Sequence, residues 1–425
     1  MKIITDIAIA GTGVAGLYCA LSLPKDKDIT IITKSEADKS DSFLAQGGIS
    51  MLRNDDDYDS YFEDTMRAGH YENNKESVDI MIRSSQWVIN DLVRLGVEFA
   101  KNSDGTLKFT REGAHSTPRI CFHEDITGKE ITSKLLEEAY RHRNIKIIEN
   151  TKLIDITEHN GRCTGFVTRK ESGEIMQICA RFSVLATGGI GGLYRNSTNY
   201  PHLTADALAI AKKHGVELLN IGYVQIHPTT LYQTSRGRRF LISESVRGEG
   251  AVLLNADMER FTDELQPRDV VSAAIWKQME KDNKPYVWLS MLPIEKEVIK
   301  AHFPNIYRRC LEEGYDVTKE CIPVVPAQHY FMGGIKVNSN SKTTMDNLYA
   351  AGETSCNGVH GKNRLASNSL LESLVFAKRA ADDIALNFDM CEMDFRDINP
   401  VDYIDCDKDY EKMMLEDIEK EKNNG

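Results

Sequence analysis

Short apolar runs alternate with longer segments of helical periodicity along this chain. The runs at 3–10, 29–33, 182–186 and 348–351 have the length and composition of buried strands, and glycine or polar residues follow each of them. A helical pattern begins near Val14, directly after the first run. Strands that alternate with helices in this way predict an α/β fold built on a parallel sheet.

Helical periodicity also covers 77–95 and about 128–142, and the apolar stripe of the first segment indicates packing rather than a binding face. Between 145 and 181 the pattern changes to short alternating strands, with turns at 160–161 and 172–173. We interpret this segment as a β-meander that is inserted into the domain of the first strand.

The first strand ends in three glycines with the spacing G-x-G-x-x-G. Gly11 permits a tight turn, Gly13 lets the backbone approach a pyrophosphate, and Gly16 lets the next helix pack closely on the strand. Phosphates bind at such a helix N-terminus because its free N–H groups and positive dipole end face them. An ordinary strand–helix turn with spare glycines is the alternative. Because a strand and a helix flank the motif, we favour a dinucleotide-binding turn.

The second strand departs from the pattern of NAD-binding folds. An acidic residue usually holds a ribose there, but this strand ends in Thr33-Lys34-Ser35, with Glu36 just beyond. A dinucleotide other than NAD is therefore favoured. The glycine-rich loop 40–48 can lie flat on a planar ring, and Glu353, after the strand at 348–351, is placed to accept hydrogen bonds from a polyol or a sugar.

Composition and charge exclude several classes of function. The 425 residues are enough for two or more domains, and 41% hydrophobic with 27% charged residues is typical of a soluble globular protein. The net charge of -12 argues against nucleic acid as a partner, because a phosphate backbone needs a basic surface. No apolar run reaches the roughly 18 residues of a membrane helix. The nine cysteines form no C-x-x-C pair, so metal ligation is unsupported and a cytoplasmic protein is expected.

Small polar clusters gather between 221 and 330. We predict that this block is a capping domain that carries substrate-binding residues. It would interrupt a discontinuous cofactor-binding domain formed by 1–220 and 331–388. The remaining residues, 389–425, form a short acidic tail with little periodicity, although 408–422 can form a charged helix.

Ten short segments occur in one order along the chain, namely GTGVAG, AQGG, REGAHS, LATGG, IHPT, SESVRGEG, PRD, HY, YAAGE and NRLASNSLLES. With them the sequence resembles the L-aspartate oxidase family of the succinate dehydrogenase and fumarate reductase flavoprotein superfamily, from Asp6 to about Ala381. The resemblance implies a Rossmann-type FAD-binding domain with a β-meander, interrupted by an α+β capping domain. Family members usually continue into a C-terminal helical bundle, which we expect to be missing or vestigial here.

The resemblance also implies FAD as the cofactor and assigns its binding residues by position. The glycine turn would hold the pyrophosphate, Lys34 would lie at the adenosine end, and 41–48 would run along the isoalloxazine ring. The predicted cofactor-binding residues are Gly11, Thr12, Gly13, Val14, Ala15, Gly16, Lys34, Asp41, Ser42, Phe43, Leu44, Ala45, Gln46, Gly47, Gly48, Asp206, Glu353, Ser369 and Leu370.

The mode of FAD attachment depends on one position of the loop. In the respiratory relatives, a histidine of this loop bonds covalently to FAD. The aligned residue here is Asp41. Because a carboxylate cannot form a histidyl–flavin bond, the sequence predicts non-covalent FAD.

L-Aspartate brings two carboxylates and one ammonium, and each charge needs a partner in a site that excludes water. Arg364 suits one carboxylate as a two-pronged donor, while His227 and His329 can donate to carboxylates and Ser243 adds a hydroxyl. The predicted catalytic residues are Arg268, Glu112, His227, His329 and Arg364, and the predicted substrate-binding residues are Ser243, Glu244, His227, His329 and Arg364.

Glu112 decides between aspartate and succinate, because only aspartate carries an ammonium that needs an anion. By resemblance, Glu112 orients the amino acid. The alternative is a surface carboxylate paired with Arg111. Arg268 resembles the family's proton-transferring arginine, and whether it also acts as a base in aspartate oxidation stays open, since an arginine normally remains protonated.

The resemblance implies oxidation of L-aspartate to iminoaspartate by hydride transfer to flavin N5, with oxygen or fumarate as acceptor. The product would enter quinolinate and NAD biosynthesis, which makes quinolinate synthase a candidate partner. The alternatives are a soluble fumarate reductase or succinate dehydrogenase flavoprotein and a non-catalytic flavin-binding subunit. The Asp41 loop, the REGAHS segment and the expected lack of the C-terminal bundle weigh against the first. The retained Arg268 and Arg364, with His227 and His329, weigh against the second.

Overall fold

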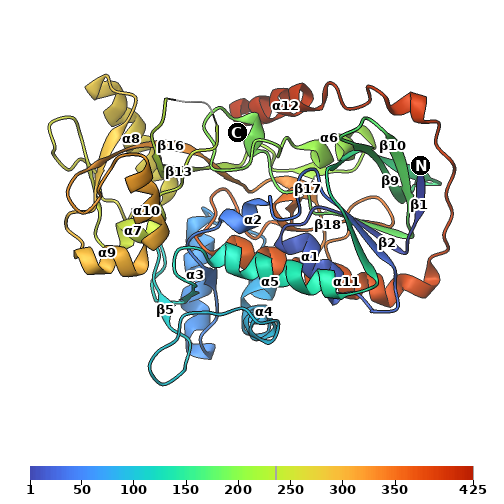
Figure 1. Cartoon of the computed structure of the whole chain (residues 1–425), viewed down its shortest axis with the longest axis horizontal. Helices are drawn as coiled ribbons and strands as arrows, with labels where there is room; N and C mark the ends of the chain where they lie inside the picture. The colour runs from blue at the N-terminus through green and yellow to red at the C-terminus, as the bar shows by residue number, and fades with distance from the viewer. Residues whose placement is uncertain (235–236, 425) are drawn as a thin grey trace.

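A five-stranded sheet lies at the centre of the computed structural model, which describes residues 1–234 and 237–424 (Figure 1). Its strands are all parallel and follow the order β18-β11-β2-β3-β7. They are β2 (Ile7–Ala10), β3 (Ile29–Ile32), β7 (Ile145–Ile148), β11 (Phe182–Leu185) and β18 (Leu348–Ala350). The α/β fold is confirmed, and all five carboxyl ends lie at one edge of the sheet.

Helices cover this sheet and complete the largest core. The helix α1 (Val14–Ser22) packs against α11 (Asn368–Asn387) and α5 (Thr127–Arg141), and α11 also packs against α4 (Lys75–Arg94). A further helix, α3 (Tyr58–Ala68), packs on α4. The two helices that the apolar periodicity predicts at 77–95 and 128–142 are therefore confirmed within two residues as α4 and α5.

The composition of the first apolar run, 3–10, predicts one strand, and this prediction is wrong. The run is divided into β1 (Lys2–Ile4) and β2, which belong to different sheets. The division falls at two polar residues. Thr5 Oγ1 donates to the carbonyl of Asp28 at 2.9 Å, and the Asp6 carboxylate accepts from the Asp28 N–H at 2.9 Å. These side-chain bonds add to the backbone bonds of Thr5 with Cys179 and of Asp6 with Asp28, where the chain crosses between sheets.

The β-meander is confined to a shorter segment than predicted. It consists of β8 (Thr151–His159), β9 (Arg162–Lys170) and β10 (Ile175–Cys179), with β1 added in parallel at the edge. The predicted segment began at Ile145, but that run is β7 of the central sheet, where its alternate apolar side chains face the core.

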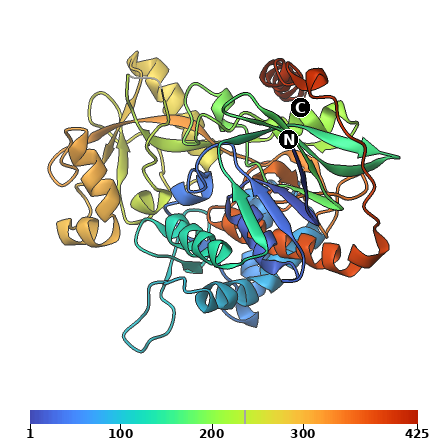
Figure 2. The ribbon, with the colours of Figure 1, turned by 45° about the vertical axis from the view of Figure 1, so that its right-hand side comes forward.

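A second group of elements, drawn mostly in yellow and orange, gathers at one end of the molecule in both views (Figures 1 and 2). Its antiparallel sheet has the order β13-β16-β15-β14 and a separate apolar core. Its elements are β13 (Val224–Leu231), α7 (Glu244–Gly248), β14 (Val252–Leu254), α8 (Arg268–Asp282), β15 (Val287–Ser290), α9 (Lys296–His302), α10 (Pro304–Glu312) and β16 (Ile322–Phe331). The mixture of strands and helices agrees with the expected α+β cap, while the domain boundaries stay a prediction.

Short elements connect these groups. They are α2 (Asp41–Leu44), β4 (Ile49–Ser50), β5 (Phe109–Thr110), β6 (Ile120–Cys121), α6 (Asp206–Lys213), β12 (Leu218–Leu219), β17 (Gly334–Lys336) and β19 (Ser355–Cys356), with single 3-10 turns at Asp55–Asp57, Gly191–Leu193, Gly352–Thr354, Phe388–Met390 and Pro400–Tyr403. None of the helices within the described ranges is long and apolar enough to span a membrane.

The charged helix that is predicted at 408–422 is present at the end of the C-terminal segment, and it is docked on the second core. The helix α12 (Tyr410–Asn424) lies along α6 in both views (Figures 1 and 2). Tyr410, Met414 and Ile418 follow one another at intervals of four residues, and all three are buried in the second core. Charged residues surround this narrow apolar stripe, which is why the segment shows little periodicity in the sequence.

Met414→Ala is expected to lower the free energy of unfolding by about 2–5 kcal/mol, because Met414 is completely buried and its truncation leaves a cavity. Thermal or urea unfolding measures the change. Lys412→Ala, at a side chain that is 78% exposed on the same helix, is the control and should change stability by less than about 0.5 kcal/mol. Equal stabilities for the two variants would mean that α12 is not docked in solution.

Candidate active site

A cavity runs along the carboxyl edge of the parallel sheet and reaches the capping strands. Four strand ends contribute to its wall, through Gly11 after β2, Lys34 after β3, Thr187 after β11 and Glu353 after β18. Open α/β sheets place their ligands at this edge. Strands that are far apart in the sequence therefore contribute to one site, as the glycine-bearing strand ends predicted.

The glycine turn has the geometry that its spacing predicts. Gly11 has a φ of +117°, and a Cβ atom there would lie 2.0 Å from the carbonyl oxygen of Ala186. A Cβ on Gly16 would lie 2.1 Å from the carbonyl oxygen of Gly11, so only glycine lets α1 pack this closely on β2. The first turn of α1 faces the cavity, and the Val14 N–H donates to Ser42 Oγ at 3.1 Å.

Lys34 and Asp206 form an ion pair at one end of the cavity. Lys34 Nζ lies 2.7 Å from Asp206 Oδ2 and also donates to Thr204 Oγ1 at 2.9 Å. Lys152 contacts the same carboxylate at 3.2 Å and pairs with Asp407 of the C-terminal segment at 2.7 Å. A chain of alternating charges thus connects the residues before α12 with the cavity wall.

Two carboxyl groups of partly buried residues line the cavity wall. Asp41 Oδ1 accepts from the Tyr200 N–H at 2.9 Å, and Glu353 Oε1 accepts from the Phe331 N–H at 2.9 Å. Burial raises the pKa of Asp41 to about 7. Burial, together with the nearby Asp41, raises the pKa of Glu353 to about 8. Near neutral pH these groups can donate as well as accept hydrogen bonds, which suits a ligand rich in hydroxyl groups.

The cavity wall also carries buried polar atoms that a bound ligand could pair with. Ser40 Oγ, Gln46 Oε1 and His227 Nε2 are buried there and have no hydrogen-bond partner within the described ranges. A buried polar atom without a partner costs roughly 1–3 kcal/mol. Their concentration on one wall, together with the glycine turn, fits a long polar cofactor such as a dinucleotide.

Two arginines converge at the end of the cavity nearest the cap. Arg268, at the start of α8, donates through Nη1 to Gln225 Oε1 at 2.7 Å, and Arg364 donates through Nε to the same oxygen at 3.3 Å. Both side chains are buried. Burial and the neighbouring Arg268 lower the pKa of Arg364 to about 10, so it remains protonated at neutral pH. The result is a cationic region on a protein that is acidic overall.

Glu244 pairs with arginine rather than opening to the cavity as a free carboxylate. Its Oε2 accepts from Arg268 Nε at 2.5 Å and lies 3.8 Å from Arg247 Nη2. Burial alone would raise the pKa of Glu244, but Arg268 and Arg247 together hold it below its usual range. Ser243 caps α7 through a bond to the Ser245 N–H. The predicted contact of Glu244 with substrate stays a prediction, while its contact with Arg268 is observed.

His227 and His329 lie side by side, with ring centroids 5.1 Å apart. His227 Nδ1 accepts from the Thr229 N–H at 3.1 Å, which leaves the proton on Nε2, toward the cavity. Burial, followed by the charge of Arg268, lowers the pKa of both rings well below 6.5. Both histidines are therefore neutral, and His227 offers one N–H donor to a ligand.

Glu112 is buried, with 4% of its surface exposed, and it lines the cavity. Oε1 accepts from Ser245 Oγ at 3.1 Å, and Oε2 accepts from Ser367 Oγ. Burial and the nearby Glu244 raise its pKa, so a cation that approached it would stabilise the charged form. Arg111 donates instead to the carbonyl of His115 at 2.7 Å. The alternative of a surface pair between Glu112 and Arg111 is therefore wrong.

The cavity brings together nearly all of the predicted site residues. All five predicted catalytic residues line it, and of the predicted cofactor-binding residues only Gly16, which packs α1 on β2, and Phe43 do not. Sequence reasoning missed Gln225, Ser245 and Ser367, although each lies in or beside a recognised segment. Their roles depend on partners from distant segments, which a linear pattern does not contain.

Comparison with known proteins agrees with this arrangement. The family model described as FAD binding domain matches residues 6–370. The L-aspartate oxidase of Clostridium perfringens is 51% identical over 394 residues, which cover 92% of this chain and 89% of that protein. The L-aspartate oxidase of Clostridium acetobutylicum is 48% identical over 430 residues, which cover 100% of this chain and 99% of that protein.

Among solved structures, a mutant of FrdA from E. coli quinol fumarate reductase is 30% identical and superimposes with a TM-score of 0.87, covering 98% of this chain and 75% of that one. The fold and the cavity thus define a flavoprotein with an FAD-binding domain. The chain belongs to this FAD-binding family and, within it, to the L-aspartate oxidases.

Proposed function

We propose that the protein uses FAD to oxidise L-aspartate to iminoaspartate and passes the electrons to oxygen or fumarate. The product would enter quinolinate and NAD biosynthesis. One observation carries the proposal, beside the names of the clostridial relatives. A buried acid, Glu112, lies on the same cavity wall as two buried arginines, Arg268 and Arg364.

This set of charges complements L-aspartate. Arg268 and Arg364 pair with the two carboxylates, and His227 adds a neutral donor at Nε2. Charge-assisted hydrogen bonds contribute roughly 1.5–3 kcal/mol each, so several of them offset the desolvation of a dianion. Glu112 supplies the negative charge that the substrate ammonium requires.

When bound, FAD supplies the acceptor for the hydride that leaves the substrate Cα. The glycine turn, Lys34 and Glu353 would hold the cofactor along the sheet edge, and the cap would exclude water from the reacting carbon. Glu244 orients the guanidinium of Arg268 by accepting from its Nε. Position and electrostatics are the contributions of the protein itself.

Turnover with defined products tests this function. Protein loaded with FAD should consume L-aspartate and yield equal amounts of oxaloacetate and ammonium, because iminoaspartate hydrolyses to these two products in water. Under anaerobic conditions, one fumarate should become succinate for each aspartate that is consumed. Turnover of a different amino acid in preference to aspartate would contradict the proposal.

A fumarate reductase is the second candidate, favoured by the 30% identity to the E. coli reductase chain. The two functions differ at Glu112, since a site for succinate or fumarate gains nothing from a buried acid beside two dicarboxylate-binding arginines. The buried position of Glu112, between two serine hydroxyls, therefore supports the amino acid as substrate.

FAD is expected to dissociate when the protein is denatured in acid, because Asp41 occupies the position where the respiratory relatives carry a flavin-linked histidine. The Asp41 carboxyl faces the cavity and can form hydrogen bonds only. Precipitation with acid and absorbance of the supernatant measure the outcome. Yellow colour that stays with the precipitated chain would show a covalent bond and refute this expectation.

A further inference from the structure

We propose that Arg119 is a positioning residue that holds Glu112 in the orientation required for an amine-bearing substrate. This inference rests on the proposed function, because it assumes that Glu112 receives the substrate ammonium. Arg119 does not line the cavity, and its side chain is completely buried. It acts through the loop 111–117 and through the turn that precedes α11.

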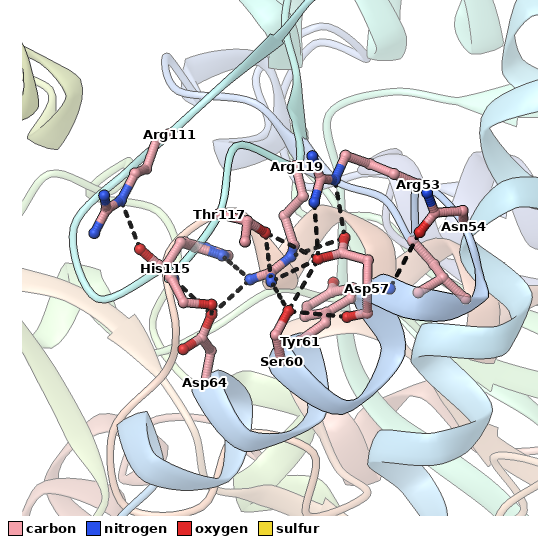
Figure 3. Close-up of polar contacts among 12 residues, drawn as sticks. Arg53, Asn54, Asp57, Ser60, Tyr61, Asp64, Arg111, His115, Thr117 and Arg119 are labelled. Carbon is pink, nitrogen blue, oxygen red and sulfur yellow. Dashed lines mark hydrogen bonds and ion pairs between the residues drawn. The ribbon is translucent and has the colours of Figure 1, made fainter.

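Arg119 is the centre of a polar cluster beneath this loop (Figure 3). Its Nη2 donates to Asp57 Oδ1 at 3.1 Å, and its Nη1 donates to Asp64 Oδ2 at 2.7 Å. Asp57 directly precedes α3, and Asp64 lies within this helix. The guanidinium also lies 4.8 Å from the centre of the Tyr61 ring. Arginine is required here because five donors in a rigid plane reach several partners at once.

The cluster is connected to the loop by direct hydrogen bonds. Asp64 Oδ2, which accepts from Arg119, also accepts hydrogen bonds from the backbone N–H and the hydroxyl of Ser116, each at 2.7 Å. Thr117 Oγ1 bonds to Asp57 Oδ1 at 2.9 Å. These contacts fix the residues that follow Glu112, and Ala114, with a φ of +65°, holds the tight turn between them.

His115 connects Arg119 with the turn before α11, which contacts the Glu112 carboxylate from a second segment of the chain. Arg119 Nη1 lies 3.0 Å from His115 Nδ1, and because a guanidinium only donates, Nδ1 must be the acceptor. The proton is then on Nε2, which donates to the carbonyl of Ala366 at 3.0 Å. Figure 3 shows the His115 ring beside the guanidinium of Arg119.

The residue after Ala366 contacts Glu112 directly. Ser367 has a φ of +62°, and its hydroxyl donates to Glu112 Oε2. Asn368, the next residue, accepts from the Tyr61 hydroxyl of the cluster at 2.9 Å. Both the loop that bears Glu112 and the turn that binds its carboxylate are therefore held by the same buried arginine.

The cluster keeps this form over the ordinary pH range. Burial alone would raise the pKa of Asp57 and Asp64. Arg119, together with the hydroxyl and amide donors around these two carboxylates, holds both pKa values below the usual range. Burial lowers the pKa of His115 to about 4, although Asp64 and Glu244 favour its charged form. His115 thus remains the neutral tautomer that connects Arg119 with Ala366, and Arg53 and Arg67 add positive charge at the rim.

The test compares three variants with one control, all as FAD-loaded protein. Arg119→Lys keeps the charge but cannot reach both aspartates and His115. His115→Phe removes both ring contacts, whereas His115→Gln retains an N–H donor where Nε2 lies. Arg53→Lys is the matched control, because Arg53 pairs with Asp57 at 3.2 Å from outside and does not contact the loop.

Arg119→Lys and His115→Phe should lower kcat/KM for L-aspartate at least 10-fold, mostly through KM, while fumarate reduction changes less than threefold. His115→Gln should recover most of this loss, and Arg53→Lys should resemble wild type. A purely structural role would lower both activities and the Tm together. An unchanged ratio of the two activities in His115→Phe would overturn the inference, even if Arg119→Lys failed to fold.

Glu112→Gln, assayed in parallel, separates this inference from the proposed function. If Glu112→Gln does not change the ratio of aspartate oxidation to fumarate reduction, the proposed role of Glu112 fails, and the positioning role falls with it. If Glu112→Gln lowers the ratio and His115→Phe does not, only the role of Arg119 and His115 is refuted.

Discussion

Arg268→Leu is expected to lower both L-aspartate oxidation and fumarate reduction by at least about 10²-fold, the loss typical of removing a preorganised charged donor from an active site. Arg268 is buried, is held by Glu244 and Gln225, and lines the cavity beside Arg364. Its removal deletes one of the two cations that would bind the substrate carboxylates. It also removes the closest cationic partner of the buried Glu244, which adds repulsion toward a dianion.

Steady-state rates with each substrate measure this loss. Arg308→Leu is a suitable control, because it removes the same charge from a side chain of the cap that is 70% exposed. Arg268→Lys should retain part of the activity, since a lysine keeps the charge but cannot donate to both Glu244 and Gln225 in one plane. Turnover of Arg268→Leu at the rate of wild type would remove Arg268 from the site.

Glu112→Gln is expected to lower kcat/KM for L-aspartate by about 10- to 100-fold and to leave fumarate reduction nearly unchanged, because only aspartate carries an ammonium. Glutamine keeps the size of the side chain and can still accept from Ser245 or Ser367 through its carbonyl oxygen. The loss would therefore report the missing charge rather than a collapsed loop.

Glu98→Gln, at an exposed carboxylate, controls for a general change of charge. The measurement is the ratio of the two activities in each variant. Equal losses on both substrates in Glu112→Gln would show that Glu112 supports the site as a whole and does not select the amine.

Local patterns sufficed for the parts of the fold that depend on backbone geometry. The spacing of Gly11 and Gly16 predicted the close contact of α1 with β2, which the structure shows to leave no room for a Cβ at either position. Parallel strands end at the same edge of their sheet. Glycine or an acid directly after a strand therefore predicted that the ligand cavity lies along this edge. Glu353 could be placed at the cavity on this basis alone, whereas the placement of Lys34 came from the family resemblance.

Features that depend on distant partners could not be predicted in this way. The run that contains β1 and β2 is interrupted only by Thr5 and Asp6, and its pairing with β10 and β3 is what shows that it belongs to two sheets. Arg119 follows an ordinary polar loop in the sequence, and its burial depends on two aspartates more than fifty residues earlier. The apolar stripe of α12 is narrow, and only its contact with α6 shows that this stripe is buried.

The central proposal is that the cationic pocket, with Glu112 as the acid for the substrate ammonium, selects an amine-bearing dicarboxylate as the electron donor. Anaerobic mixing of the FAD-loaded protein with either L-aspartate or succinate, followed by the loss of flavin absorbance, tests it most directly. We expect L-aspartate to bleach the flavin rapidly and succinate to leave it oxidised. Bleaching by succinate at an equal or greater rate, or by neither compound, would contradict the claim.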